Sequence, residues 1–464
     1  MFDDLFVDTD AGAETAAISE KELAKSLSIG YGTDSAAYQG GRALVPEDCE
    51  TTMINAMREQ KEDCKMMNKV KKQPVASTVH EYNRRLDAGD YENATAEEGG
   101  GSVDTDQDIE RVTRLIKYIQ IRRAVTDQAR LVQAFEDCWE SEKLMGTLSA
   151  LKAAERLFFH GDSDVVPTEW DGIPKQIISA KEPNILDYRG KRIQQIGDES
   201  ITEMVYQIYE RGGDANTLFF PPILGIDIQE LARERIRFGT NDKSLAPVFD
   251  SYPTPYGTVK FGEDEGPDKF YRVKGLIKPN GSGQMRPGAP TATATATTES
   301  KSKFFTADAG NYKYTIHAVN KYGISVGYDL AASVPVSAGD GVRVRITQNP
   351  DKPGTGYVVC RSAPNGNVVM ELIRIKAEKT GETLFIDLNE ELPGTASMLF
   401  LTEKKLQTIV QFDQLIPLRL RPLYESNKAE TPFFIQLFGT ADVKVPEWCG
   451  ITKNLGYKGG LYNG

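Results

Sequence analysis

The sequence has few of the residues on which enzyme chemistry depends. Its 464 residues include only 3 histidines, His80, His160 and His317, which lie far apart. His80 and Glu81 begin like a metalloprotease helix motif, but position 84 is arginine where the second histidine would stand. No Walker loop, nucleophile elbow or dinucleotide-binding glycine motif is present. These absences argue against an enzyme, and we expect no cofactor and no metal.

Cysteine and long apolar runs are also scarce. The 5 cysteines are scattered, odd in number and without close spacing, so neither a disulfide framework nor a zinc site follows from them. No stretch approaches the about 18 apolar residues that span a bilayer. The acidic N-terminus lacks the apolar segment of a secretion signal. We therefore expect a soluble intracellular protein with no membrane partner.

Positive charge is not in excess. The formal net charge is −12 at pH 7. An acidic chain does not grip nucleic acid through its overall field, so sequence-specific DNA binding is not expected.

One block, residues 286–395, has the pattern of a complete β-sandwich inserted into another protein. Short apolar stretches separated by Gly, Pro, Asn and Asp are typical of an immunoglobulin- or fibronectin-like sandwich. The stretches lie at residues 291–298, 312–320, 341–348, 356–361, 368–375 and 383–388. A sandwich of this size can fold alone, so the flanking segments are expected to close around it as one interrupted domain.

Residues 1–72 are predicted to be a long polar arm, with helical character from residue 49 onward, and not a packed domain. Such arms usually become ordered against a partner, and a disordered tail is the equal alternative.

Residues 73–124 predict a long hairpin with an open tip. One stretch rich in β-formers runs from 74 to 85 and a second from 109 to 123, on either side of a polar tip. The second stretch also fits a helical spacing, but its density of Ile, Val, Thr and Tyr favours a strand. An isolated hairpin is marginal in water, so we expect it to lie on a neighbouring subunit. The residues predicted to make inter-subunit contacts are Arg84, Arg85, Arg111, Arg114, Arg122 and Arg123, with Glu97 and Glu98 in the tip.

A single long helix is predicted from Thr126 and Asp127, which supply its N-cap, to about His160. At 1.5 Å per residue it would be a rod of about 50 Å, suited to the spine of an elongated domain. Trp139 and Trp170 could pack at its two ends. Helical and strand patterns alternate after it, and extended apolar runs return after the sandwich block, so the fold class is α+β.

The order of these segments resembles the major capsid proteins of tailed bacteriophages with the Hong Kong 97-type fold. It most resembles those of large contractile-tailed phages of Gram-positive hosts, which also have an immunoglobulin-like insertion. The residues on which the resemblance rests are Pro74-Val-Ala-Ser-Thr-Val-His-Glu-Tyr in the hairpin, 155–162 and 171–173 after the helix, and 407–423 and 433–454 near the end.

The resemblance implies a division into six segments. They are an N-terminal arm (1–72), an extended hairpin loop (73–124), a peripheral domain with the spine helix (125–198), an axial domain (199–285), the immunoglobulin-like insertion (286–395) and a return through the axial domain to the peripheral strands (396–464). Copies would form hexamers and pentamers of an icosahedral head around double-stranded DNA. Scaffold, portal and possible decoration proteins would be further partners, with assembly in the host cytoplasm before the head becomes part of the virion.

Some shells of this family are locked by a Lys–Asn isopeptide bond whose lysine lies near the hairpin. Here no lysine lies between Lys72 and Lys117, so we predict a non-covalent lattice. The resemblance also leaves open a proteolytic loss of the segment before about Gly30. For the insertion we predict an outward-facing module, either stabilising or decorative, which we favour, or adhesive toward glycans.

Two other classes of protein remain as alternatives. A tail or baseplate protein could contain an adhesion-type sandwich, but such chains usually lack a long spine helix. A carbohydrate-active enzyme with an accessory sandwich would need a secretion signal and a pair of carboxylates in a cleft.

Overall fold

The computed structural model describes residues 65–87, 106–131, 137–233, 251–261, 274–281, 283, 285–402, 409–424 and 429–462. The chain divides into two compact units, Met1–Met57 with Gln128–Cys138, and Arg58–Asp127 with Trp139–Gly464. The fold below is that of the second unit.

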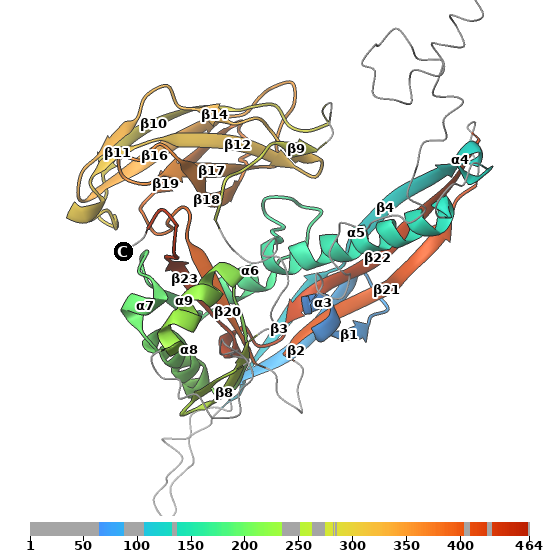
Figure 1. Ribbon diagram of the computed structural model, residues 1–464, viewed down its shortest axis with the longest axis horizontal. Helices are drawn as coiled ribbons and strands as arrows, with labels where there is room; N and C mark the ends of the chain where they lie inside the picture. The colour runs from blue at the N-terminus through green and yellow to red at the C-terminus, as the bar shows by residue number, and fades with distance from the viewer. Residues whose placement is uncertain are drawn as a thin grey trace, which may run out of the picture. The chain divides into compact units, whose positions relative to one another are not determined.

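A four-stranded sheet, which we call the spine sheet, combines strands from both ends of the sequence (Figure 1). Its order is β1 (Lys71–Pro74), β21 (Val410–Pro422), β22 (Glu430–Val443) and β4 (Lys117–Thr126). Strand β22 is antiparallel to both of its neighbours, whereas β1 is parallel to β21.

Helix α5 (Cys138–His160) packs on one face of the spine sheet. Ala150 of α5 is buried with Phe433 and Ile435 of β22. Gly146 makes this close approach possible, because a Cβ at that position would collide with Ile435. The tryptophans pack at the two ends of α5 as predicted. The centroid of the Trp139 ring lies 4.8 Å from that of Phe433, and the centroid of the Trp170 ring lies 6.0 Å from that of Phe158.

The predicted single helix from residue 126 is wrong in its first part. A short helix, α4 (Asp127–Leu131), is followed by residues outside the described part of the chain, and Asp137 is not helical. Asp137 directly precedes α5, and Asp favours the N-cap position over a helix interior. Helix α5 ends at His160 as predicted, and its 23 residues span about 35 Å.

The last residues of the predicted arm are packed and not extended into solvent. In α3 (Lys65–Lys69), Met66 and Met67 are buried in the core beneath α5. The buried carboxylate of Glu155 accepts hydrogen bonds from the backbone amides of Met66 (2.7 Å) and Met67 (2.9 Å). Residues 1–64 lie outside the described part, so the remainder of the arm stays a prediction.

The predicted hairpin forms from β2 (Val79–Asp87) and β3 (Asp108–Leu115), which pair antiparallel. Its second strand is shorter than predicted, because the chain changes sheets at Ile116. The Ile116 side chain is buried, its amide donates to the Thr78 carbonyl (2.9 Å), and β4 then begins in the spine sheet.

A second sheet has six strands in the order β5 (Asn184–Asp187), β23 (Gly450–Leu455), β20 (Ala396–Thr402), β6 (Ala215–Phe219), β8 (Gly257–Phe261) and β7 (Ser251–Thr254). The helices around it are α6 (Ile173–Ile178), α7 (Ile193–Ile196), α8 (Glu199–Glu210), α9 (Pro222–Arg233) and the 3-10 turn η4 (Pro446–Trp448). Helix α8 and strand β6 belong to the alternating helical and strand patterns predicted after the long helix.

The block at 286–395, which we call the insert, folds into β-sheets that share one core. Val344 and Ile346 from one sheet meet Ile316 and Tyr357 from another in this core. The first sheet has the order β10 (Thr291–Thr298), β16 (Asp340–Thr347) and β19 (Glu382–Asp387). The larger sheet has β18 (Val369–Lys376), β17 (Gly356–Ser362), β12 (Tyr314–Asn320) and β13 (Gly323–Ile324), with β14 (Tyr328–Asp329) paired to β12. Its edge strand β9 (Asn280–Gly281) lies before residue 286, outside the block. A third pair is β11 (Gly310–Tyr312) with β15 (Val334–Val336), preceded by the 3-10 turn η3 (Thr306–Asp308).

Candidate subunit interface: the hairpin and its base

The hairpin of β2 and β3 has two chemically different faces, because side chains alternate along each strand. His80, Tyr82 and Arg84 of β2, with Arg114 of β3, contact residues of the spine sheet or the chain that follows it. The opposite face is exposed and includes Val79, Ile109 and Leu115, which are 41%, 50% and 58% exposed. We call this opposite face the open hairpin face.

Two buried carboxylates lie beneath the hairpin. Asp413 of β21 and Asp442 of β22 have side chains with 0% exposure. Lys444, just after β22, places its Nζ 2.7 Å from Asp442 Oδ2 and 4.0 Å from Asp413 Oδ2. A buried charge is stable only with such partners, so the carboxylate pair needs cations around it.

The hairpin supplies further partners for these carboxylates. Arg114 Nε donates to Asp442 Oδ1 at 3.0 Å, and the Tyr82 hydroxyl donates to the same oxygen at 3.2 Å. His80 Nε2 lies 3.7 Å from Asp413 Oδ2. Lys444 Nζ also lies 3.7 Å from the centroid of the Tyr82 ring, a cation–π contact. We call these six residues the hairpin latch; they are His80, Tyr82, Arg114, Asp413, Asp442 and Lys444.

The proton affinities in the latch follow from this burial. Burial raises the pKa of the Asp413 carboxyl, and the Asp442 charge adds to the effect, against the opposing influence of Lys444 and His80. Burial, followed by the Asp442 charge, raises the pKa of the Tyr82 phenol. Tyr82 therefore stays a hydrogen-bond donor at neutral pH.

The structure separates the predicted contact residues into three groups. Arg84 and Arg114 are turned toward their own chain, with Arg84 paired to Glu110 (2.7 Å) and Glu447 (3.4 Å). Arg85 and Arg111 lie on the open hairpin face, where Arg111 is 68% exposed and 3.8 Å from Glu81.

The third group is not in the hairpin at all. Arg122 and Arg123 belong to β4 of the spine sheet, a correction to their predicted place. Arg122 pairs with Glu430 (2.8 Å) and Arg123 with Glu142 of α5 (3.1 Å). The predicted residues Glu97 and Glu98 lie outside the described residues.

Sequence reasoning missed Asp413, Asp442 and Lys444. A signal was available, because Asp413 follows Phe412 and Asp442 lies between Ala441 and Val443, so each carboxylate interrupts an apolar strand. Such a position indicates a buried carboxylate that needs a cation.

Neither a metal centre nor a membrane segment is found in the described ranges. No group of 3 or more His, Cys, Asp or Glu side chains there could hold a metal ion. Likewise, no helix among the described residues is long and apolar enough to cross a bilayer.

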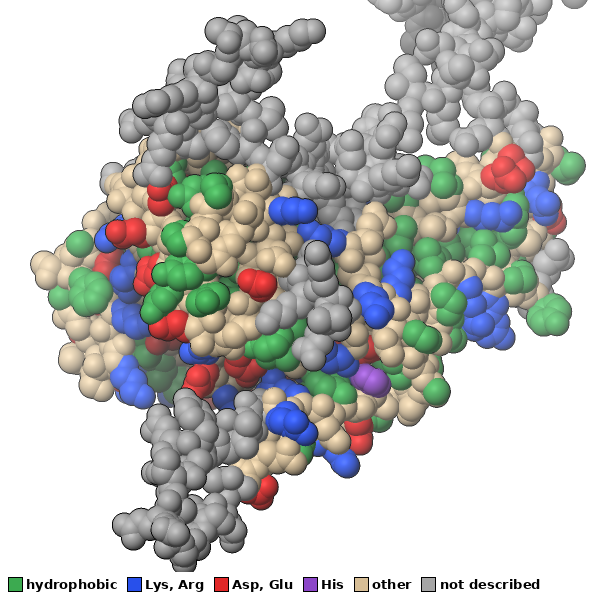
Figure 2. Space-filling view, turned by 90° about the horizontal axis from the view of Figure 1, so that it is seen from below, with side chains coloured by type: hydrophobic (Ala, Val, Ile, Leu, Met, Phe, Trp, Pro, Cys, Tyr) green, Lys and Arg blue, Asp and Glu red, His purple; other side chains and the backbone are tan. Residues whose placement is uncertain are grey.

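One face of the molecule shows Lys and Arg side chains interspersed with apolar ones (Figure 2).

Comparison with known proteins gives one family. The family model described as SU10 major capsid protein matches residues 33–265, half of the chain. The family match therefore identifies the class of protein: a major capsid protein, the structural subunit of a phage head. The chain belongs to the SU10 major capsid protein family. This decides between the capsid and the tail or baseplate alternatives in favour of the capsid.

Solved structures give only distant likenesses. The capsid of the native GTA particle is 10% identical, with 92% of this chain and 100% of that chain covered and a TM-score of 0.45. A structure from Mycobacterium phage Adephagia is 8% identical, with 90% and 98% covered and a TM-score of 0.44. The holo-SrpI encapsulin complex from Synechococcus elongatus PCC 7942 is 10% identical, with 90% and 94% covered and a TM-score of 0.40. No curated protein sequence matches this chain. At these TM-scores the structural likenesses support no further argument, and the assignment rests on the family match.

Proposed function

We propose that copies of this chain tile an icosahedral head as hexamers and pentamers, with the Hong Kong 97-type fold, and that the open hairpin face contacts a neighbouring copy. The observation that supports this most directly is the exposure of three apolar residues, Val79, Ile109 and Leu115, beside Arg85 and Arg111. A hairpin that exposes apolar and cationic side chains together is suited to a second protein surface with apolar and acidic groups.

In this proposal the arginines have two different tasks. Arg84 and Arg114 hold the hairpin on its own subunit through Glu447 and Asp442, whereas Arg85 and Arg111 face the neighbour. The same contact recurs at every copy in a ring. Even an ion pair of small free energy therefore contributes many times to the stability of the shell.

The experiment compares charge reversals on the open hairpin face with a charge reversal on the insert. In the double variant Arg85→Glu with Arg111→Glu, we expect the yield of closed shells to fall at least tenfold by negative-stain electron microscopy. The thermal midpoint of the unassembled chain should not change, because both side chains are exposed.

The matched control is Arg345→Glu, an exposed arginine of the insert, which should leave shell yield unaltered. Shells at the wild-type yield from the double variant would contradict the role of the open hairpin face. If the wild-type chain alone remains monomeric, the comparison is repeated by co-expression with the neighbouring phage genes, which would supply a scaffold.

Further parts of the proposal concern the partners and the insert. The insert is proposed to be an immunoglobulin-like module exposed on the outer surface of the head, supported by the sheets of the insert, which share one core. Scaffold, portal and decoration proteins, packaged double-stranded DNA, assembly in the host cytoplasm and a Gram-positive host are implied by the resemblance to contractile-tailed phages. The net charge of −12 supports weak, non-specific contact with the packaged DNA.

A further inference from the structure

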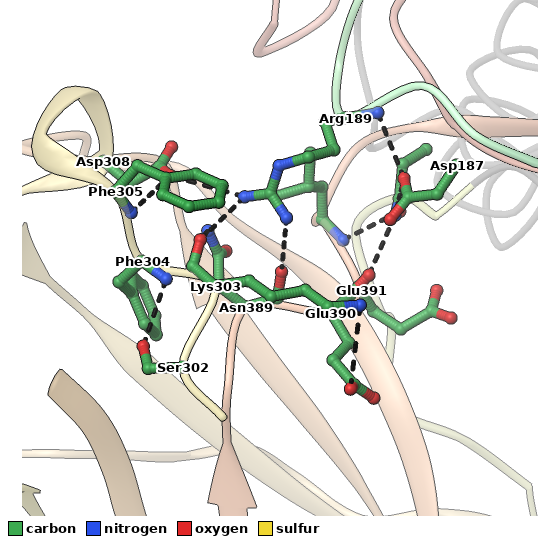
Figure 3. A network of polar contacts seen from close by, with 12 residues as sticks. Asp187, Arg189, Ser302, Lys303, Phe304, Phe305, Asp308, Asn389, Glu390 and Glu391 are labelled. Atoms are coloured by element: carbon green, nitrogen blue, oxygen red, sulfur yellow. Dashed lines mark hydrogen bonds and ion pairs between the residues drawn. The ribbon is translucent and has the colours of Figure 1, made fainter. Parts of the chain in front are cut away.

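The insert is held to the rest of the chain by a polar junction around Arg189, which lies in the turn after β5 (Figure 3). An Arg189 amino group donates to the Lys303 carbonyl of the insert at 2.8 Å and lies 3.4 Å from Asp308 Oδ2. Its guanidinium also lies 4.9 Å from the centroid of the Phe305 ring. Arg189 therefore binds one segment of the insert through charge, hydrogen bond and ring contact together.

The exit of the insert is fixed at the same junction. Asn454 of β23 donates through Nδ2 to Asp187 Oδ1 (2.8 Å) and to the Glu390 carbonyl (2.9 Å). Its Oδ1 accepts from the backbone amide of Leu392 at 2.9 Å. The segment that leaves the insert is thus tied to the second sheet by backbone and side-chain hydrogen bonds, which a free linker lacks.

Backbone conformation gives independent support. Among the described residues, four other than glycine have a positive φ, and three of them lie at this junction: Arg189 (49°), Asn389 (60°) and Asn454 (55°). Asn tolerates the left-handed region, but that backbone is unfavourable for Arg189 and persists there only where the surrounding contacts enforce it. The junction is therefore a built structure.

The C-terminal residues close the junction against the sandwich core. Arg361 of β17 is fully buried, with amino groups 2.6 Å from Asp387 Oδ2 and 2.6 Å from Asn389 Oδ1. The Tyr462 side chain lies close enough to the same guanidinium to interact with its charge. Gly190 packs against the Tyr462 ring, where an added Cβ would come within 3.1 Å.

A second, apolar contact lies elsewhere on the insert. Val165 and Val166, in the loop after α5, are buried together with Val319, Val358 and Cys360 of the insert. A Cβ at Gly356 would come within 2.6 Å of Val165 Cγ1, so this glycine allows the close approach.

Strand β17 shows how complete the docking is. All 7 of its residues, Gly356–Ser362, are buried. A strand in a self-contained sandwich has one face toward the core and one toward solvent. In β17 one face takes part in the sandwich core, through Tyr357 and Val359, and the other is covered by the apolar contact, through Val358 and Cys360.

We propose that the insert is an internal brace of the subunit. One anchor is the loop after the spine helix, at Val165, and the other is the junction at Arg189, Asn454 and Tyr462 on the second sheet. The spine sheet and the second sheet already share a core, in which Phe412 and Leu437 are buried with Leu401. By joining the two anchors, the insert adds a second tie between these sheets. The consequence for shell geometry rests on the proposed capsid function, but the brace itself does not.

The test removes each anchor in the full chain. Arg189→Ala with Val165→Asp deletes both, and Arg343→Ala is the matched control, because Arg343 pairs with Glu299 inside the insert (2.6 Å). We expect amide hydrogen exchange in β17 to become at least tenfold faster in the double variant, while β16, at the far side of the sandwich core, keeps its protection. The control should show wild-type exchange throughout.

The distance between the two sheets provides the decisive measurement. Spin labels at Glu140→Cys on α5 and Glu203→Cys on α8 are placed in a chain whose Cys49, Cys64 and Cys138 are serine and whose Cys360 is alanine, because removal of the Val165 anchor would uncover that thiol. We expect the distribution of label distances to widen at least twofold when both anchors are removed. An unchanged width with fast exchange in β17 would overturn the brace and leave the insert an appendage, and unchanged exchange would overturn the anchors.

The same variants are examined for shells. If the wild-type chain forms shells, the double variant should form at least fivefold fewer closed ones. If the wild-type chain forms none even with its neighbouring phage genes, the capsid proposal fails, while the label distances still decide the brace.

Discussion

At the residue scale, the hairpin latch places two carboxylates where strands of a core are usually apolar. Asp413 and Asp442 are fully buried and face cations from two different parts of the chain. Removing Arg114 or Lys444 takes away one of the two cations beside the buried Asp442 carboxylate, so the latch is sensitive to single substitutions. Its geometry lets the hairpin lie on its own subunit in one defined position.

The raised pKa of Asp413 predicts a pH-dependent effect of Asp413→Asn. A carboxyl whose folded-state pKa is raised is stabilising in its protonated form, and this contribution is lost as pH rises through the folded pKa. The neutral amide does not ionise. We therefore expect the variant to be more stable than the wild type at pH 7, with a difference that shrinks toward zero near pH 3.

Urea unfolding of both proteins across this pH range measures the difference, and comparison with the wild type at each pH removes the effect of all other titrating groups. A variant that is less stable at pH 7 would show that the Asp413 charge is a net stabiliser through His80 and Lys444.

At the scale of elements, much of the fold follows from local patterns and much does not. The Thr-Ala alternation of β10 and the end of α5 at His160 agree with the sequence prediction. The change of sheets at Ile116 could not be foreseen, because an uninterrupted run of β-formers has no turn residue to mark it. The latch was missed for a related reason: its partners lie in strands hundreds of residues apart, and spacing along one segment cannot pair them.

The space around two helical glycines, Gly146 in α5 and Gly225 in α9, predicts opposite effects when each is replaced by alanine. In Gly146→Ala the new methyl collides with Ile435, and we expect a loss of about 1–3 kcal/mol in the free energy of unfolding. In Gly225→Ala, in α9, the nearest atom is Phe220 Cε2 at 3.4 Å. There the gain in helix propensity should dominate, with about 0.5–1 kcal/mol of added stability.

Chemical denaturation of the two variants side by side measures both effects. Equal destabilisation by the two substitutions would show that the collision with Ile435 is not what destabilises the Gly146→Ala variant.

At the scale of the whole molecule, the subunit is a set of sheets tied together by contacts distant in sequence. The family match concerns residues 33–265, yet the latch and both anchors of the insert also use residues beyond this range. The part that resembles relatives therefore depends on the remainder for its position.

The shell is predicted to be non-covalent, because no lysine lies between Lys72 and Lys117 to form an isopeptide bond in the hairpin tip. Particles boiled in detergent should run as a single band of the subunit on a denaturing gel. A ladder of covalent multimers would contradict this, and mass spectrometry of the ladder would identify the linked residues.

The spine sheet also has a consequence for synthesis on the ribosome. Its strand β4 pairs with β22, so that Arg122 meets Glu430 across 308 positions of sequence. Folding rates fall as contacts become less local, and an N-terminal segment emerges long before its partner. While the second sheet and the insert are being translated, β4 has no β22 to pair with. A nascent chain can therefore complete the spine sheet only after β22 has been translated, so a chain that stops before Glu430 lacks the strand that holds β4 in place.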